Sequence, residues 1–147
     1  MKKIFKNIVL FCIGGLLYIC LELTFRGRSH ISMFFVGGFC SFNIGLINEV
    51  IPWEMSLVFQ SLIGSVIVTM TELVSGIFLN IFFGLNVWNY SNLPFNFLGQ
   101  ICLLFSLLWG IASCVWIICD DYLRFWLFNE EKPQYRIFSL HRGTNGK

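Results

Sequence analysis

Residues 56–79 of the chain read SLVFQSLIGSVIVTMTELVSGIFL, and Glu72 is the single charged residue in this run. A helix needs about 20 predominantly apolar residues to cross the hydrocarbon core of a bilayer, and the run is long enough to do so. Three more apolar runs cover roughly residues 7–25, 31–50 and 98–119. The sequence therefore predicts an all-α fold, a polytopic membrane bundle of four transmembrane helices.

The composition agrees with a membrane protein and excludes several other classes. Charged residues make up 12% of the 147 residues and hydrophobic residues 56%, whereas about 25% of a soluble domain is charged. The net charge of +2 indicates no nucleic-acid partner. The six cysteines lie inside apolar runs without a CxxC pair, so we expect neither a disulfide framework nor a metal site.

The positions of the basic residues predict the orientation in the membrane. Only Arg26 and Arg28 lie between the first and the last apolar run, and the other basic residues lie near the two ends of the chain: Lys2, Lys3, Lys6, Arg124, Lys132, Arg136, Arg142 and Lys147. Cytoplasmic segments carry the excess of Lys and Arg. With four helices, both termini are therefore predicted to be cytoplasmic.

Two boundaries follow from local sequence signals. The third run stays apolar to Leu85, too long for an untilted span, so we expect either a break near Gly76 or Gly84 or an extension along the membrane interface. Residues 120–132 predict a short amphipathic helix in the membrane interface, which ends before Pro133. We expect residues 1–128 to form a single transmembrane domain and residues 133–147 a polar cytoplasmic tail.

Small residues recur at helical spacing on three of the predicted helices. They are Gly37, Ser41 and Gly45 on the second, Ser106, Gly110 and Cys114 on the fourth, and the more polar set Ser61, Ser65, Thr69, Glu72, Gly76 and Asn80 on the third. Such spacing lets helix backbones approach closely. The stripes therefore predict close packing within the bundle or between copies of the chain.

Two carboxyl groups lie inside apolar runs, those of Glu22 and Glu72. An ionisable group costs at least ~2.5 kcal/mol at the middle of a membrane, so each should face a partner or a cavity. Arg26 follows Glu22 by four residues, the favoured order for a helical ion pair. At helical rise, both carboxyls lie about 22–24 Å from the cytoplasmic start of their helices, toward the outer leaflet.

Polar residues of the outer loops should lie at the same level as these carboxyls. The predicted substrate- or ion-binding site comprises Glu22, Arg26, Arg28, Glu72, Asn80, Trp88, Tyr90, Asn96 and Gln100. The same residues could instead form a structural network that fixes helix packing, or the carboxyls could reach the outer interface. The sequence has no phosphate-binding loop, hydrolase signature or metal motif, so we predict no catalytic residue and no cofactor.

The segment Trp88-Asn89-Tyr90-Ser91, followed by Pro94-Phe95-Asn96 and Gly99-Gln100-Ile101-Cys102, resembles a family of small bacterial multi-pass membrane proteins described as Putative ABC-transporter type IV. The stretch from Glu22 to Gly27, Glu72 with Gly76, and Trp109 fit the same pattern. The resemblance covers roughly residues 18–109. It implies a transporter permease in the bacterial cytoplasmic membrane with a separate ATPase subunit. Family members often have Asp where this chain has Asn89, so a cation or proton site at that Asp would be missing here.

Two functions from different classes remain open. The first is a permease-like transport component for a small polar or ionic solute, driven by an ATPase or by protons. Four helices are few for a permease, so we expect a homo- or hetero-oligomer in the lipid bilayer. The alternative is a non-transporting scaffold or accessory protein with a structural ion cluster. An intramembrane enzyme that acts on lipid is a more distant alternative, because no nucleophile or metal set accompanies the carboxyls.

Overall fold

The structure is a computed structural model that describes residues 2–50 and 55–135. It is mostly helical, as predicted. In chain order the elements are α1 (Lys2–Arg26), α2 (Ser32–Gly45), α3 (Ile47–Val50), α4 (Leu57–Gly76), the π-helix η1 (Ile77–Phe82), β1 (Asn96–Phe97), β2 (Ile101–Cys102) and α5 (Leu103–Phe128).

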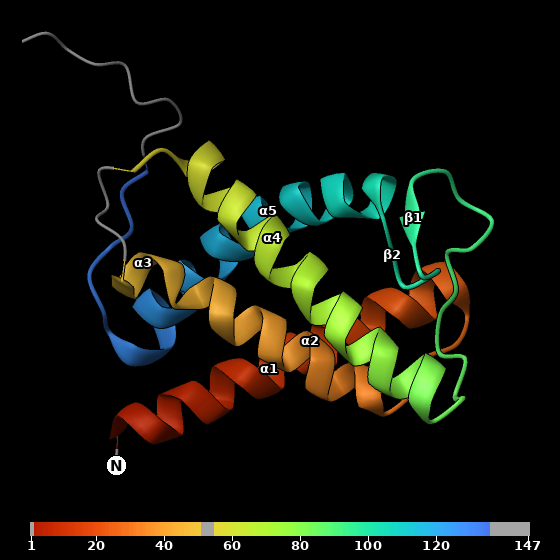
Figure 1. Ribbon diagram of the computed structural model, residues 1–147. Coiled ribbons are helices and arrows are strands. Elements are labelled where there is room, and N and C mark those ends of the chain that lie inside the picture. The colour runs from red at the N-terminus through yellow and green to blue at the C-terminus, as the bar shows by residue number, and fades with distance from the viewer. Residues whose placement is uncertain (1, 51–54, 136–147) are drawn as a thin grey trace, which may run out of the picture.

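The helices run back and forth between the same two ends of the molecule (Figure 1). At one end, Lys6 of α1 pairs with Glu49 of α3 at 3.0 Å and with Glu130, just after α5, at 2.6 Å. We call this the terminal end. At the other end, Arg26 of α1 donates to the carbonyl of Val87, beyond η1, at 3.0 Å. We call it the hairpin end, because β1 and β2 lie there. The fold is thus an antiparallel bundle of four helical passes.

Among the described residues, three helices are long and apolar enough to cross a membrane: Lys3–Arg26, Leu57–Phe82 and Leu103–Phe128. The run predicted over 31–50 is divided, because α2 ends at Gly45 and α3 resumes after Leu46. With 14 residues, α2 alone is ~21 Å long, less than the ~30 Å of a hydrocarbon core. The fold is therefore consistent with an all-α membrane bundle. In such a bundle the second pass is long enough to cross the hydrocarbon core only if α2 and α3 cross it together.

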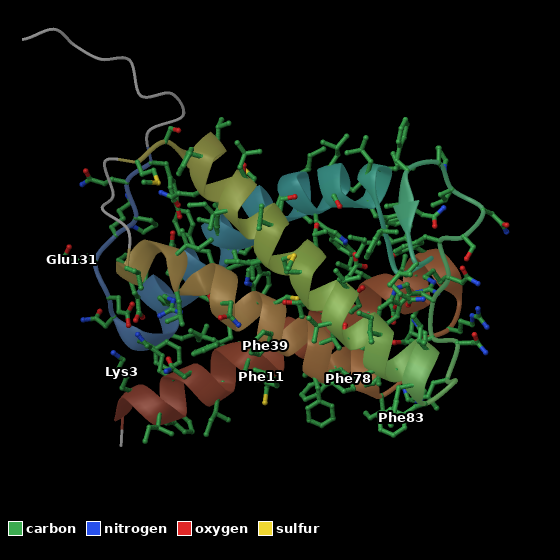
Figure 2. All side chains as sticks on the ribbon, viewed as in Figure 1. Lys3, Phe11, Phe39, Phe78, Phe83 and Glu131 are labelled. Atoms are coloured by element: carbon green, nitrogen blue, oxygen red, sulfur yellow. The ribbon has the colours of Figure 1, made fainter. Side chains whose placement is uncertain are left out.

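Apolar side chains cover the outside of the bundle, while several polar ones lie within it. Figure 2 shows Phe39, Phe78 and Phe83 on the outer surface, and between half and two thirds of each is exposed. The buried polar residues are Glu22, Gln60, Glu72, Asn80, Gln100, Ser113, Asp120, Asp121 and Arg124. This distribution suits a chain surrounded by hydrocarbon, where polar groups must find partners inside the protein.

The third pass changes its geometry where its sequence predicted a break. The α-helix becomes a π-helix after Gly76, and the helical segment ends at Phe82. Gly84 follows with a φ of +65°, a left-handed conformation that glycine adopts without steric cost. Both glycines named from the sequence therefore mark a change in the path of the chain.

The fourth pass starts later than predicted. Residues 98–102 belong to a hairpin instead of the predicted helix over 98–119, with Asn96 opposite Cys102 and Phe97 opposite Ile101. Leu98 and Gly99 form its turn with φ values of 53° and 67°, which interrupt any helix. The helix α5 begins only at Leu103.

The prediction of a separate interfacial helix over 120–132 is wrong. One continuous helix, α5, runs to Phe128 and ends at Asn129, which is left-handed with a φ of 56°. Asp120 and Asp121, the acidic residues that suggested an interface, are buried inside the bundle. Arg124 donates to Asp120 and Tyr135 to Asp121, so both carboxyls have partners there. Of the predicted polar tail over 133–147, residues 136–147 lie outside the described part. Tyr135 packs against the core and donates to Asp121 at 2.7 Å.

The small-residue stripes pack against other helices of the same chain. On the third pass, Ser65 donates to the carbonyl of Ser106 at 2.5 Å and Thr69 to its hydroxyl at 3.1 Å, so that this stripe faces α5. The stripe on α2 lies against α1 and α5: Gly37 is next to Tyr18, Ser41 next to Gly14, and Gly45 next to Asp120. The close packing that the spacing predicted is present within the bundle.

Candidate functional site

Glu22 and Arg26 form the predicted ion pair near the end of α1. Arg26 Nη1 lies 2.7 Å from Glu22 Oε1, and the hydroxyl of Ser29 donates to Glu22 Oε2 at 2.5 Å. Glu22 is buried, whereas Arg26 is about one third exposed. Because Arg26 also donates to the carbonyl of Val87, this pair connects the loop after α1 with the loop after η1.

A pocket of about 170 Å³ opens beside this ion pair at the hairpin end. It is smaller than the ~300–1,000 Å³ of sites for drug-sized ligands. Its polar lining includes Glu22, Arg26, Arg28, His30 and Asn86. Within the described residues, the Arg28 side chain makes no hydrogen bond or ion pair. The pocket thus contains one paired and one unpaired guanidinium group.

Glu72 is held in a different way. Its side chain is buried, with the residue 3% exposed, and each carboxyl oxygen accepts one hydrogen bond. Tyr90 donates to Oε1 at 3.0 Å and Trp109 Nε1 donates to Oε2 at 2.7 Å. Among the described residues, no Lys or Arg forms an ion pair with it. The two predicted carboxyls therefore belong to two separate groups rather than to one cluster.

Aromatic rings surround the Glu72 carboxyl. Tyr90 stacks on Phe105 with ring centroids 4.6 Å apart, and Trp109 lies 6.1 Å from Tyr18 and 6.4 Å from Phe105. Burial and the neighbouring carboxyl of Glu72 raise the pKa of Tyr90. Its hydroxyl therefore stays protonated and able to donate to Glu72.

A third group fixes the loop after η1. Asn80 donates to Gln100 Oε1 at 2.8 Å and accepts from the backbone N–H of Val87 at 2.7 Å. Trp88 donates from its indole to the carbonyl of Gln100 at 3.0 Å. Gly76 permits this arrangement, because a Cβ there would lie 2.6 Å from Gln100 Oε1. These residues hold the loop against the bundle.

Asn96 lies apart from both carboxyls. Its amide donates to the carbonyls of Ser91 and Leu93, and its oxygen accepts from Gly99 N–H at 3.2 Å. It fixes the turn of the hairpin. The predicted residues thus divide into a pocket group (Glu22, Arg26, Arg28), a Glu72–Tyr90 group, a loop group (Asn80, Trp88, Gln100) and Asn96.

A second cluster of charges at the terminal end was not singled out from the sequence. Arg124 donates from Nε to Asp120 Oδ2 at 2.5 Å and also pairs with Glu49, which accepts from Lys6. Asp120 is 0% and Arg124 3% exposed. The i,i+4 spacing of Asp120 and Arg124, the same as in the pair on α1, is the signal that could have indicated a buried pair.

The carboxyl of Glu49 links the other charges of this cluster, because its Oε1 accepts hydrogen bonds from both Lys6 and Arg124. The cluster joins α1, α3 and α5 at one point and includes Glu130 through Lys6. Its role in the fold is to hold the terminal end together.

The long apolar helices and the polar interior define a polytopic helical membrane protein. The chain belongs to the family described as Putative ABC-transporter type IV, whose model matches residues 6–139. This match confirms the family resemblance that the segment beginning at Trp88 indicated. No curated protein and no solved structure matches the chain. Family and fold together make it a membrane protein related to transport.

Proposed function

We propose that the chain is a permease-like subunit that binds a small polar or ionic solute in the hairpin-end pocket. The observation that carries the proposal is the open pocket of about 170 Å³ with Glu22, Arg26 and Arg28 in its lining. Placing charged groups at the level of the membrane costs free energy. Because the pocket is open and still retains such groups, solute binding accounts for them better than helix packing alone.

The charges of the pocket favour a solute that carries an anionic group. Glu22 neutralises Arg26 at 2.7 Å, which leaves Arg28 as the guanidinium without a protein partner among the described residues. A guanidinium offers several N–H donors in a planar arrangement that matches a carboxylate or a phosphate. The small volume limits the solute to a few non-hydrogen atoms beyond that group.

The distribution of basic residues favours an outward-facing pocket. Lys3 and Lys6 lie on the first turns of α1 and Lys132 follows α5, at the terminal end, and cytoplasmic segments carry the excess of such residues. We therefore assign the terminal end to the cytoplasm of a bacterial cell and the hairpin end to the outer face of its cytoplasmic membrane. Both termini are then cytoplasmic.

Four passes leave little room for a complete translocation pathway, so the subunit acts with partners. The family favours a separate ATPase subunit, and further copies of this chain or another permease complete the pathway. The chain itself is proposed to be neither an enzyme nor a nucleic-acid-binding protein. Four transmembrane passes require that α2 and α3 cross the bilayer together.

Arg28→Gln tests the proposal most directly. Because the Arg28 side chain makes no hydrogen bond or ion pair in the described part of the chain, the substitution should leave folding intact while it removes the free positive charge. We would screen the detergent-solubilised protein by thermal shift against acetate, inorganic phosphate and glycerol. We expect the anions to stabilise the wild type, and Arg28→Gln to weaken their binding by at least tenfold. Lys132→Gln, at an exposed position after α5, is the matched control.

The proposal fails if none of the anions binds, or if one binds equally well to the wild type and to Arg28→Gln.

A non-transporting scaffold is the second candidate. The hydrogen-bonded Asn80–Gln100–Trp88 group favours it, since such networks fix packing. It predicts that Glu22→Arg combined with Arg26→Glu restores the stability and the partner association that either single change removes. Solute uptake by liposomes that contain the purified protein and its partner would exclude the scaffold.

A further inference from the structure

The loop after α1 is held on both sides of Arg28. Before it, the N–H of Gly27 donates to the carbonyl of Leu23 at 3.1 Å and continues the hydrogen bonds of α1. After it, the hydroxyl of Ser29 donates to Glu22 Oε2 at 2.5 Å. The Arg28 side chain lines the hairpin-end pocket and makes no hydrogen bond or ion pair within the described residues. The loop therefore presents this guanidinium from a fixed backbone, which lowers the ordering cost of binding.

His30 is a second lining residue with a donor to spare. The backbone N–H of Ser32 donates to His30 Nδ1 at 3.2 Å, and the Ser32 hydroxyl lies 2.8 Å from the same atom. Because Nδ1 accepts, the neutral imidazole carries its proton on Nε2. No hydrogen bond within the described residues uses Nε2. His30 belongs to the lining and Ser32 does not, so the ring is bonded outside the pocket and retains one N–H for a ligand.

The carboxylate and guanidinium groups of the lining favour a singly charged anion. Glu22 and Arg26 neutralise each other at 2.7 Å, so Arg28 gives the pocket one net positive charge. A monoanion balances that charge. A dianion would place surplus negative charge beside the Glu22 carboxylate, and like charges at short range repel each other. The pocket therefore matches a ligand with a single negative charge.

The two spare donors favour a tetrahedral anionic group over a planar one. A guanidinium binds two oxygens in its own plane through parallel N–H groups. A carboxylate has only these two oxygens, so none remains for a donor outside that plane. A sulfonate or a phosphodiester has further oxygens out of the plane. Such a group can therefore accept from Arg28 and His30 at the same time.

We propose that the hairpin-end pocket selects a singly charged tetrahedral oxyanion, a sulfonate or a phosphodiester, which accepts from both Arg28 and the Nε2–H of His30. This inference rests on the proposed function, because it names the class of anion that the same pocket takes. It assigns His30 as a binding residue that determines specificity. The competing role for His30 is purely structural, in which Nδ1 only fixes the start of α2 at Ser32.

The experiment compares methanesulfonate with acetate, which carry the same charge and one methyl group and differ in the geometry of the anionic group. The full chain in a maltoside detergent is titrated with each sodium salt at constant ionic strength, and binding is followed by calorimetry and by thermal shift. We expect methanesulfonate to bind at least tenfold more tightly, because acetate lacks the additional hydrogen bond to a charged group. Equal affinities that both depend on Arg28 would overturn this inference and leave the proposed function standing. Failure of both anions to bind would overturn the two together.

Two variants of His30 separate binding from structure. His30→Gln places an amide N–H near the position of Nε2, whereas His30→Asn keeps an acceptor near Nδ1 for the Ser32 N–H and lacks the more distant donor. We expect His30→Gln to retain most of the preference for methanesulfonate, and His30→Asn to reduce it at least fivefold without a change in melting temperature. Asn92→Ala, exposed in the loop before β1 and outside the lining, is the control. An undiminished preference in His30→Asn contradicts the proposal.

The tetrahedral group has two sources, a small free solute and the phosphodiester of a lipid headgroup. Nanodiscs of phosphatidylcholine and of an uncharged galactolipid separate them, because neither surface has a net charge and only the first contains phosphodiesters. With a headgroup as the occupant, methanesulfonate binds more weakly in phosphatidylcholine, and with a free solute it binds equally in both. Both results retain the tetrahedral class, whereas loss of the preference over acetate in both nanodiscs contradicts it.

Discussion

Gly45 of α2 lies directly against the carboxyl group of Asp120 on α5, so closely that a Cβ at position 45 would be 2.6 Å from Asp120 Cγ. Asp120 in turn holds Arg124 at 2.5 Å. The absence of a side chain at Gly45 is therefore what allows a buried ion pair at the terminal end. It also explains why the small-residue stripe of α2 ends on glycine.

Gly45→Ala should destabilise the protein by about 1–3 kcal/mol, the usual cost of overpacking a well-packed interior. Reversible unfolding in detergent would measure the loss. Gly110→Ala on α5 is the matched control, because its Cβ would meet Ser65 at an ordinary 3.7 Å. The control should be neutral or gain up to ~1 kcal/mol from helix propensity. Equal losses in both variants would contradict the steric explanation.

Arg124→Met should cost about 3–5 kcal/mol, since it leaves Asp120 and Glu49 without their shared guanidinium. Combining it with Asp120→Leu should recover much of that loss, because a well-packed apolar pair can replace a buried ion pair. Unfolding free energies of the two single variants and the double variant form the test. A double variant as unstable as the sum of the single ones would show that the pairing is not what matters.

Tyr90→Phe should destabilise the protein by about 1–3 kcal/mol, because it removes one of the two donors to the buried Glu72 carboxyl. The stack of the ring on Phe105 is retained. Tyr122→Phe serves as the control, since its hydroxyl makes no hydrogen bond within the described residues. A loss in Tyr90→Phe no greater than in the control would mean that this hydrogen bond contributes little.

The four passes predict that both ends of the chain lie on one side of the membrane. Reporter domains fused to the N-terminus and to the C-terminus should both give cytoplasmic signals in cells. If α2 and α3 fail to cross, only three spans remain, and the reporters would lie on opposite sides. The four-span and three-span topologies therefore predict opposite sides of the membrane for one of the two reporters.

Local spacing predicted the local features of this molecule. The Glu22–Arg26 pair, the end of the third pass near Gly84, and the stripe that faces α5 all follow from residues within one or two helical turns. The two hydrogen bonds to Glu72 come from Tyr90 and Trp109, which are 18 and 37 positions away from it in the sequence. The register between helices decides such contacts, and no pattern within one helix determines that register.

Burial of Asp120 could not be predicted for the same reason. Charge at positions 120 and 121 is typical of a membrane interface, and only the contact with Gly45, far away in the sequence, makes room for it inside the bundle. The hairpin was missed because Leu98 adopts a left-handed backbone, which leucine rarely does and which composition does not reveal.

The π-helical segment η1 has a consequence for how related sequences should be aligned. Phe83 N–H bonds to the carbonyl of Phe78, five residues earlier, rather than to that of Leu79. A turn closed in this way holds one residue more than an α-helical turn. A relative that is one residue shorter between Gly76 and Gly84 can regain ordinary α-helical turns while the helices on either side keep their contacts. An alignment gap in this part of the family therefore belongs inside η1.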